Sequence, residues 1–552
     1  MFPLKSSGDS SARIMFIGES PSGNDLKAGQ PFMGSSGNEF SLMLHEAGIL
    51  RSEVYLTYAC KHMPFRGDMK SHFTKMTKLT WIPKDILIKG ITDLWEEIER
   101  VQPNVIVPLG NVALWAVTGI KQAGKYRGSV MESDPVLPSI KQSRVFKVIP
   151  TYNPSVVMRM WSWRHIAVQD FRRVATEQAF PEIKIPDYIF HIRPSFKQAI
   201  DFLDHIQHDY PDEQNISVDI ETIARHIACV GYGASTREAM CIPIMCRDDE
   251  RGYWSATEEL AIVQKQREVL RTKNILGQNF NYDAQYLFRH WCVRPKHTND
   301  LMIAWHTMYP GERKSLDYIS SLVLPYYAYW KDELKDYKNY PLNEENFWIY
   351  NCKDIVNTYE SFELIYPMVT AQNLSEQYRF QMDLHMPVLD MMLRGTKIDI
   401  EKKNNLGFEL LNTMTEYDNL FDSILPAKWL KPKAKSPWWN SPKQLSELFY
   451  DVLRLPIQKH KKTKKPTTDD AALEALKQQE PILKLLFQYL QEYRSVGVFK
   501  NNFIDTRVEN DNRMRCTFSI PGTETFRFSS SEDAFGYGTN LQNIPAGNKK
   551  DV

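Results

Sequence analysis

Three short segments of this chain place acidic side chains at spacings that could hold metal ions. The first holds Asp219 and Glu221, two residues apart in a run where apolar and polar residues alternate. A β-strand here would bury Ile216, Val218 and Ile220 and present both carboxylates on its other face. Neighbouring carboxylates repel each other unless divalent cations neutralise them, so the pair indicates a metal site. Taken alone, it could equally be an exposed pair on a surface strand.

The other two segments use a spacing of four residues. Asn279 and Asp283 follow a strand-like run, and Tyr350 and Asp354 lie in a helical pattern. Residues four apart share one face of a helix, so we expect each pair to point the same way. Either pair by itself could be an ordinary polar pair on a helix surface.

In combination, Asp-x-Glu, Asn-x-x-x-Asp and Tyr-x-x-x-Asp, in this order, resemble the DEDDy 3′-to-5′ exonucleases. The resemblance covers roughly residues 190–368, and the segments 277–279 and 298–302 are similar to the proofreading domain of bacterial DNA polymerase I. It implies a ribonuclease H-like fold, hydrolysis of DNA from its 3′ end and release of nucleoside monophosphates. Asn279 is expected to contact the DNA.

The resemblance also implies a division of roles at the site. Asp219, Glu221, Asp283 and Asp354 would hold two Mg²⁺ or Mn²⁺ ions about 4 Å apart, which would clamp the scissile phosphate and stabilise both the attacking and the leaving oxygen. Tyr350 would orient the attacking water, whose pKa the ions would lower.

Residues 371–552 carry a second resemblance. Segments 395–399, 441–445, 525–530 and 540–545 are similar to the thumb and the beginning of the palm in family A DNA polymerases, although Phe526 stands where that family has glycine. The residues expected by this resemblance to contact primer or template are Arg494, Arg527, Gln542 and Asn543.

A basic run lies within this C-terminal region. Its lysines are Lys459, Lys461, Lys462, Lys464 and Lys465. Within a polymerase thumb they would bind duplex phosphates, an attraction that is sensitive to salt and independent of sequence. In most proteins such a run is a solvated loop, and that alternative stays open.

The sequence stops before the place where the family's catalytic palm motifs would come. We therefore expect DNA synthesis to need a second polypeptide that completes palm and fingers, or a missing C-terminal part.

The N-terminal motifs point to a different family. Short β-like and helical runs alternate from residue 13 to about 180, which predicts an α/β layer fold. The segments 18–21, 29–34, 54–57 and 109–110 resemble uracil-DNA glycosylases of the family 4 type, over residues 13–175. The resemblance implies a base-flipping pocket in which Phe32 stacks on the base and Glu19 is the acid of the first motif. A similar fusion with a polymerase occurs in bacteriophage replication enzymes.

Two positions depart from the glycosylase pattern. Tyr58 stands where the family has the asparagine that reads uracil, and Asn153 replaces the histidine of the His-Pro-Ser motif. Both changes weaken the expected pocket. The cysteines that ligate an iron–sulfur cluster in the family are absent, so no such cluster is expected.

Composition fits this multidomain reading. The chain has 552 residues, of which 43% are hydrophobic, so we expect an α/β multidomain protein. The predicted domains are a glycosylase-like α/β/α domain (1–185), a ribonuclease H-like exonuclease domain (186–370), and a helical thumb with the start of a palm (371–552). The 68 basic and 67 acidic residues leave a net charge of +1, which is uninformative about DNA.

The sequence also bears on the compartment. No apolar run approaches the roughly 20 residues of a membrane helix, so no membrane partner is expected. Seven cysteines without a paired spacing suit a reducing compartment. We expect a cytoplasmic protein, in the host cytoplasm if it is phage-encoded.

Two other functional hypotheses remain from the sequence. One is a uracil-removing repair protein, and the other is a non-catalytic DNA-binding scaffold for a polymerase partner.

Overall fold

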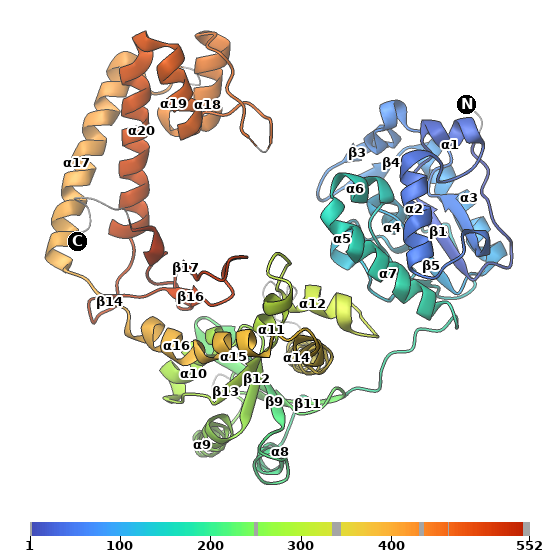
Figure 1. Ribbon diagram of the computed structural model, residues 1–552, viewed down its shortest axis with the longest axis horizontal. Coiled ribbons are helices and arrows are strands. Elements are labelled where there is room, and N and C mark those ends of the chain that lie inside the picture. Colours follow the sequence, from blue (N-terminus) through green and yellow to red (C-terminus); the bar gives the residue numbers. More distant parts are fainter. Residues whose placement is uncertain (1–2, 248–251, 334–343, 430–434, 462, 545–552) are drawn as a thin grey trace. The chain divides into compact units, whose positions relative to one another are not determined.

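The computed structural model describes residues 3–247, 252–333, 344–429, 435–461 and 463–544. The chain divides into two compact units, one of residues 1–283 and 287–382, the other of residues 284–286 and 383–552 (Figure 1). It is a mixed α/β multidomain protein, as the sequence predicts.

The first unit begins with a five-stranded sheet of order β2-β1-β5-β7-β6. Every residue of β1 is buried, and β1 pairs in parallel with both β2 and β5. A strand buried on both faces needs helices on both sides, which is the arrangement that an all-apolar run predicts for a parallel strand. The strands are β1 (Ile14–Gly18), β2 (Val54–Tyr58), β5 (Val105–Pro108), β6 (Met131–Glu132) and β7 (Lys147–Val148), with β3 (Phe73–Met76) and β4 (Trp81–Pro83) forming a separate hairpin.

Alternate residues of β1 face the two helical layers. The ring of Phe16 lies against Phe40 and Phe171, at centroid distances of 5.1 and 5.2 Å. Met15 and Ile17 instead join the core cluster formed with the third and fourth helices. The helices of this layer fold are α1 (Gly23–Ala28), α2 (Gly34–Glu46), α3 (Asp85–Val101), α4 (Asn111–Thr118), α5 (Ala123–Tyr126), α6 (Pro154–Arg159) and α7 (Arg164–Glu177).

The second sheet of this unit has six strands in the order β13-β12-β9-β10-β11-β8. β9 lies in its middle, antiparallel to β10 and parallel to β12. The strands are β8 (Ile189–His191), β9 (Asn215–Ile223), β10 (His226–Gly233), β11 (Glu238–Pro243), β12 (Asn274–Gly277) and β13 (His297–Asp300). The helices around it are α8 (Phe196–His208), α9 (Ala256–Thr272), α10 (Asn281–Trp291), α11 (Leu301–Met308), α12 (Leu316–Val323), α14 (Glu344–Ala371) and α15 (Ser375–Asp383).

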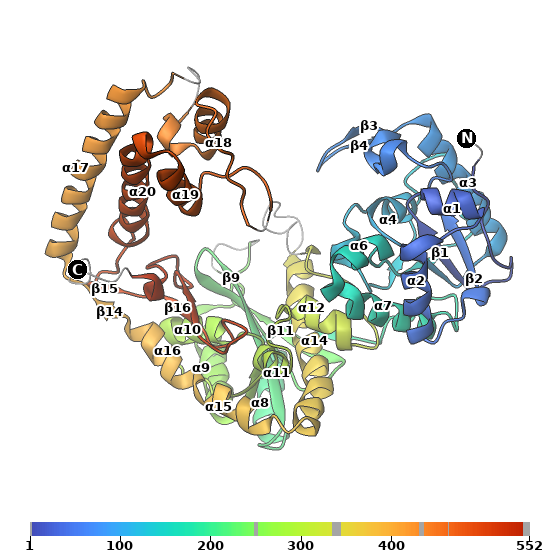
Figure 2. The same ribbon diagram turned by 45° about the horizontal axis from the view of Figure 1, so that its top comes forward.

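The long helix α14 packs across β9, β10 and β11 (Figure 2). Two glycines of β10 allow this close approach. A Cβ atom at Gly231 would lie 2.4 Å from Oδ1 of Asn351, and one at Gly233 would lie 2.6 Å from Cγ2 of Ile355. The small residues of β10 therefore bring the middle of α14 against the sheet beside β9.

The second unit is mainly helical. Its long helices α17 and α20 lie side by side (Figures 1 and 2), and an aromatic core that includes Phe421, Trp438 and Phe487 holds them to the shorter helices. Its helices are α16 (His385–Arg394), α17 (Ile400–Ile424), α18 (Pro442–Ser446), α19 (Asp470–Gln479) and α20 (Lys484–Phe499). Its short strands pair as β14 (Thr396–Lys397) with β15 (Arg513–Met514) and β16 (Thr517–Ser519) with β17 (Ser529–Ser531).

Among the helices that the structure describes, none combines the length and the apolar composition that a bilayer crossing requires.

Candidate functional site

The first half of the carboxylate centre comes from β9. Ile216, Val218 and Ile220 are buried, whereas Asp219 and Glu221 are partly exposed on the other face of the strand. The alternation seen in the sequence therefore places both carboxylates together at the middle strand of the sheet.

The second half comes from α14. Tyr350 and Asp354 are one helical turn apart and both are buried. Ligand oxygens of Asp354, Asp219 and Glu221 all lie within 4.8 Å of one another. Residues more than 130 positions apart in sequence thus converge on one small volume.

Asp283 comes from a third element and lies close enough to Asp219 for its charge to raise the pKa of that carboxyl group. It lies in the first turn of α10, and its Oδ1 accepts a hydrogen bond from the backbone N–H of Ile220 at 2.9 Å. Burial raises the pKa of its carboxyl group to about 8. Asp283 therefore ties α10 to the strand that carries the other two carboxylates.

The predicted shared helical face of Asn279 and Asp283 is wrong. Helix α10 begins at Asn281, so Asn279 precedes it, with an exposed side chain and a left-handed backbone at φ 61°. Asparagine tolerates this conformation better than most residues, which favours a turn over a continuing helix.

The centre also contains three residues that the sequence analysis missed. The Nζ atom of Lys331 lies 2.8 and 2.7 Å from the two carboxylate oxygens of Asp354 and donates to the Tyr350 hydroxyl at 2.9 Å. The indole Nε1 of Trp330 donates to Asp354 at 2.6 Å, and Nδ2 of Asn351 donates to Oδ2 of Asp219 at 3.0 Å. A single lysine that ends the aromatic run 326–330 was the available sequence signal.

Electrostatics at the centre favour a bound cation. Burial, and then the charges of Asp283, Asp354 and Glu221, raise the pKa of Asp219 well above its ordinary value. The ammonium group of Lys331 already contacts one of these carboxylates, that of Asp354. The donors are all oxygens, which is the ligand set that Mg²⁺ and Mn²⁺ prefer, so the residues fit divalent cations.

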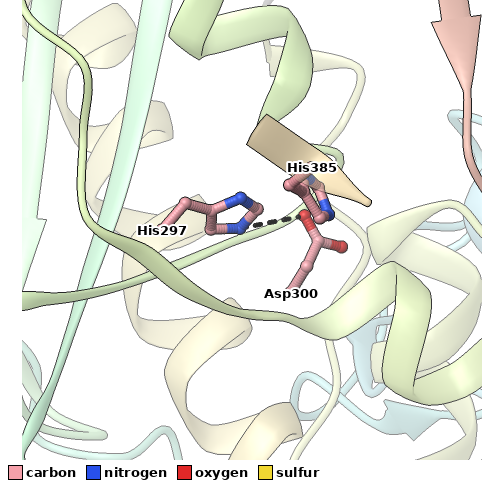
Figure 3. Close-up of side chains that lie close together, drawn as sticks. All are labelled: His297, Asp300 and His385. Atoms are coloured by element: carbon pink, nitrogen blue, oxygen red, sulfur yellow. Dashed lines mark ion pairs between the residues drawn. The ribbon is translucent and has the colours of Figure 1, made fainter. Parts of the chain in front are cut away.

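A neighbouring acidic residue has a structural role. Asp300 lies 3.5 Å from Nε2 of His297 (Figure 3). Its carboxylate accepts hydrogen bonds from the backbone N–H groups of Phe280, at 3.0 Å, and Met302, at 2.9 Å. Asp300 thus caps α11 and fixes the turn before α10.

Two of the four residues predicted for the glycosylase-like pocket, Phe32 and Tyr58, pack against each other. The Tyr58 ring stacks on Phe32 at a centroid distance of 5.1 Å and an interplanar angle of 25°. The Tyr58 hydroxyl accepts a hydrogen bond from the Phe32 backbone N–H at 3.0 Å. Phe40 also stacks on Phe32, at 4.8 Å. Phe32, the residue predicted to stack on a base, therefore stacks on two aromatic rings of the chain itself.

The other two predicted pocket residues lie apart from this stack. Glu19 and Asn153 line a neighbouring cavity of about 550 Å³, which Phe32 and Tyr58 do not line. Oε1 of Glu19 accepts from the N–H of Val112 at 2.9 Å, and burial raises its pKa. Oδ1 of Asn153 accepts from the N–H of Ser155 at 2.9 Å and caps α6.

In the second unit the predicted DNA-contacting residues are spread along the surface. Arg494, on α20, donates to the carbonyl oxygen of Thr468 at 2.7 Å. Arg527 lies just before β17, and Gln542 and Asn543 lie in a short 3-10 helix, Leu541–Asn543. Phe526 has a left-handed backbone, φ 60°, which explains why glycine would suit this position.

The basic run forms a tight, exposed loop. Lys459 and Pro466 form an isolated antiparallel β-bridge, and His460 donates its backbone N–H to the carbonyl of Lys465 at 2.9 Å. Lys461 and Lys464 are exposed, and Lys462 lies outside the described residues. An exposed loop of this kind suits both phosphate binding and a solvated surface.

Two families match parts of the chain. Residues 431–552 match DNA polymerase family A, and residues 5–178 match the uracil DNA glycosylase superfamily. The DNA polymerase of Bacillus phage SP01 is 22% identical over 96% of this chain and 63% of its own length. The chain is related to the family A DNA polymerases. It spans less than two thirds of the length of the DNA polymerases that it matches first.

The N-terminal likeness is closer. A type-4 uracil-DNA glycosylase of Thermotoga maritima is 32% identical over 30% of this chain and 78% of its own length. The N-terminal part of this polymerase-related chain belongs to the uracil DNA glycosylase superfamily. Among solved structures, the POL domain of Pol1 from M. smegmatis, in complex with DNA primer-template and dNTP, is 19% identical with a TM-score of 0.45, over 65% of this chain and 57% of that chain.

Proposed function

We propose that this chain is a 3′-to-5′ exonuclease that proofreads DNA as part of a family A DNA polymerase. The observation that supports it most is the convergence of Asp219, Glu221 and Asp354 within 4.8 Å, with Tyr350 one turn away on the same helix. These residues come from separate segments, in the order and on the element types that the exonuclease resemblance implies.

The chain's own residues divide the work at this centre. Asp219, Glu221, Asp283 and Asp354 would hold two Mg²⁺ or Mn²⁺ ions, and Asp283 also holds β9 in place through the N–H of Ile220. When bound, the ions stabilise the charge that develops on the attacking and leaving oxygens of the phosphodiester.

Tyr350 would place the attacking water. Burial and the nearby carboxylates raise the pKa of its phenol, so the hydroxyl keeps its proton at neutral pH. A neutral hydroxyl both donates and accepts hydrogen bonds, which lets it orient a water molecule without removing its proton.

DNA is the proposed substrate and partner. The relation to the family A DNA polymerases supports this, together with the exposed lysine loop and the exposed segment around Arg527. In the second unit these residues would bind the phosphate backbone, whereas cleavage would take place in the first.

Uracil excision receives less support. Tyr58 stacks on Phe32 and accepts a hydrogen bond from its backbone N–H, so the residue predicted to hold the base is already engaged by the chain itself.

The test is release of labelled mononucleotide from a 3′-labelled, mismatched primer-template in the presence of Mg²⁺. The full chain is compared with an Asp219→Ala/Glu221→Ala double variant. Asp212→Ala/Glu213→Ala is a matched control because it removes two exposed carboxylates just before the same strand.

Release by the wild type and the control, but not by the double variant, is expected. Equal release by all three proteins would mean that another nuclease is responsible. No release by any of them, at saturating Mg²⁺, would contradict the proposed exonuclease.

A further inference from the structure

Lys331 stands where the exonuclease carboxylates demand a positive charge. Its side chain is 23% exposed, and its ammonium group contacts both oxygens of Asp354. It also lies 4.9 Å from the centroid of the Tyr350 ring. A lysine ammonium is a compact point charge, so it balances the carboxylates much as a bound cation would.

The segment that carries Lys331 is held by the glycosylase-like domain. We call residues 321–333 the strap. At its start, buried Arg173 donates to the carbonyl oxygens of Ser321, at 3.0 Å, and Leu324, at 2.8 Å. Arg127 donates to the Ser321 hydroxyl at 2.6 Å. The strap thus leaves α12 in a direction fixed by two arginines of the other domain.

These contacts continue along the strap to the residue after Lys331. The N–H of Val130 donates to the carbonyl of Tyr327 at 2.7 Å, and the N–H of Tyr329 donates to the Ser129 hydroxyl at 3.1 Å. Asp332 forms an ion pair with Lys125 and accepts from the Tyr126 hydroxyl at 2.6 Å. The glycosylase-like domain therefore holds the strap through its backbone before the lysine and through the Asp332 side chain after it.

We propose that the glycosylase-like domain of this chain serves to position Lys331 against the exonuclease carboxylates, where Lys331 competes with a divalent cation for Asp354. The inference rests on the proposed function of the carboxylate centre. It assigns this domain a task inside the chain that needs no base-binding pocket.

Competition by the lysine should change the apparent Kd for the cation by a measurable factor. If a cation binds only when the lysine has moved away, its apparent affinity equals the affinity of the open state multiplied by the fraction of molecules in that state. If this state holds about a tenth of the population, the apparent Kd for the cation is about tenfold higher than for an open centre. Loosening the strap should recover part of that factor.

The test is Mn²⁺ binding to the full-length chain. Binding is measured from the electron paramagnetic resonance signal of the free Mn²⁺. Lys331→Met removes the competing cation. Asp332→Asn releases the strap from Lys125 without touching the carboxylates. Lys197→Met is the control, since Lys197 is an exposed lysine that pairs only with Asp201 on its own helix among the described ion pairs.

Asp332→Asn separates competition from simple charge effects. It removes a negative charge near the centre, so long-range electrostatics alone would weaken Mn²⁺ binding. A loosened strap would strengthen it. We expect the Kd to fall about tenfold in Lys331→Met, severalfold in Asp332→Asn and not at all in Lys197→Met.

The same proteins are assayed for nucleotide release across Mg²⁺ concentrations, which separates the two proposals. Tighter Mn²⁺ binding without nucleotide release by any variant would support the competing lysine and contradict the exonuclease. Nucleotide release by the wild type, with unchanged or weaker Mn²⁺ binding in Asp332→Asn, would overturn the competing lysine alone. Absence of Mn²⁺ binding in every variant would overturn both.

Discussion

The two sites of the first unit are both filled by side chains of the chain itself, but in different ways. Tyr58 belongs to β2, is 4% exposed and stacks on Phe32 within the core. Lys331 lies on an irregular segment and contacts the centre through its charged end. A buried ring leaves a cavity when it moves, whereas an ammonium group can be exchanged for another cation with the charges still balanced. The first site is closed by packing, and the second is closed by an exchangeable charge.

The largest effect should come from removing a carboxylate of the exchangeable site. Asp354→Asn should lower nucleotide release by about 10³-fold, since it removes a cation ligand and a negative charge at the reacting centre. The measurement is single-turnover release from the 3′-labelled primer. Glu363→Gln, an exposed position on the same helix, should keep wild-type activity. Activity within tenfold of wild type in Asp354→Asn would remove α14 from the catalytic centre.

The packed site should respond through stability. Tyr58→Ala deletes a buried ring and should destabilise the glycosylase-like domain by about 3–5 kcal/mol. Tyr58→Phe keeps the ring and removes the hydroxyl, which accepts from the Phe32 amide and also interacts with Asp25, and should cost about 1 kcal/mol. Hydrogen exchange of the β2 amides in the full chain reports both values.

One result for Tyr58→Ala would contradict the difference between the two sites. If Tyr58→Ala barely changed exchange in β2, the ring would not be part of the packing, and the glycosylase-like pocket would be as open to exchange as the carboxylate centre.

The sequence predicts the elements that carry the functional side chains better than it predicts how those side chains come together in space. Alternation of apolar residues located β9 and put Asp219 and Glu221 on one face, and the four-residue spacing did the same for Tyr350 and Asp354 on α14. Those patterns are local, so one segment is enough to read them. The strand β13 was not expected, because its residues 297–300 are polar and short.

The missed features depend on distant contacts. The strap that carries Lys331 contacts a residue 200 positions earlier, and nothing in the neighbouring sequence specifies that contact. Asn279 was misplaced for a local reason, since a left-handed residue ends one element and begins another without changing the residue spacing. Tyr58 was recognised as a departure, but its stacking on Phe32 required the structure.

A smaller effect tests the role of the hydroxyl at the carboxylate centre. Tyr350→Phe keeps the ring and should lower the rate of nucleotide release by about tenfold or more, because the water loses one orienting hydrogen bond. Mn²⁺ affinity should change little, since the hydroxyl is not a proposed ligand. Tyr366→Phe removes a hydroxyl on the same helix, bonded to Arg379, and should leave the rate unchanged. A rate equal to wild type in Tyr350→Phe would contradict the proposed role of the Tyr350 hydroxyl in placing the water.

The smallest effect concerns Glu19, the buried acid that lines the cavity beside the Phe32–Tyr58 stack. Burial raises the pKa of Glu19 above its ordinary value of 4.5, and only backbone N–H groups of Asn111 and Val112 oppose that rise. Because the folded state holds this proton more tightly than the unfolded state, the contribution of Glu19 to stability is complete below pH 4.5. It is lost as the pH rises through the higher folded value. Glu19→Gln cannot titrate, so the variant should become progressively more stable than wild type as the pH rises above about 4.5. Thermal melting of both proteins at matched pH measures this difference, with the exposed Glu53→Gln as control.

A melting difference independent of pH would mean that Glu19 keeps its charge in the fold, and that this pocket, like the carboxylate centre, supplies a compensating positive group.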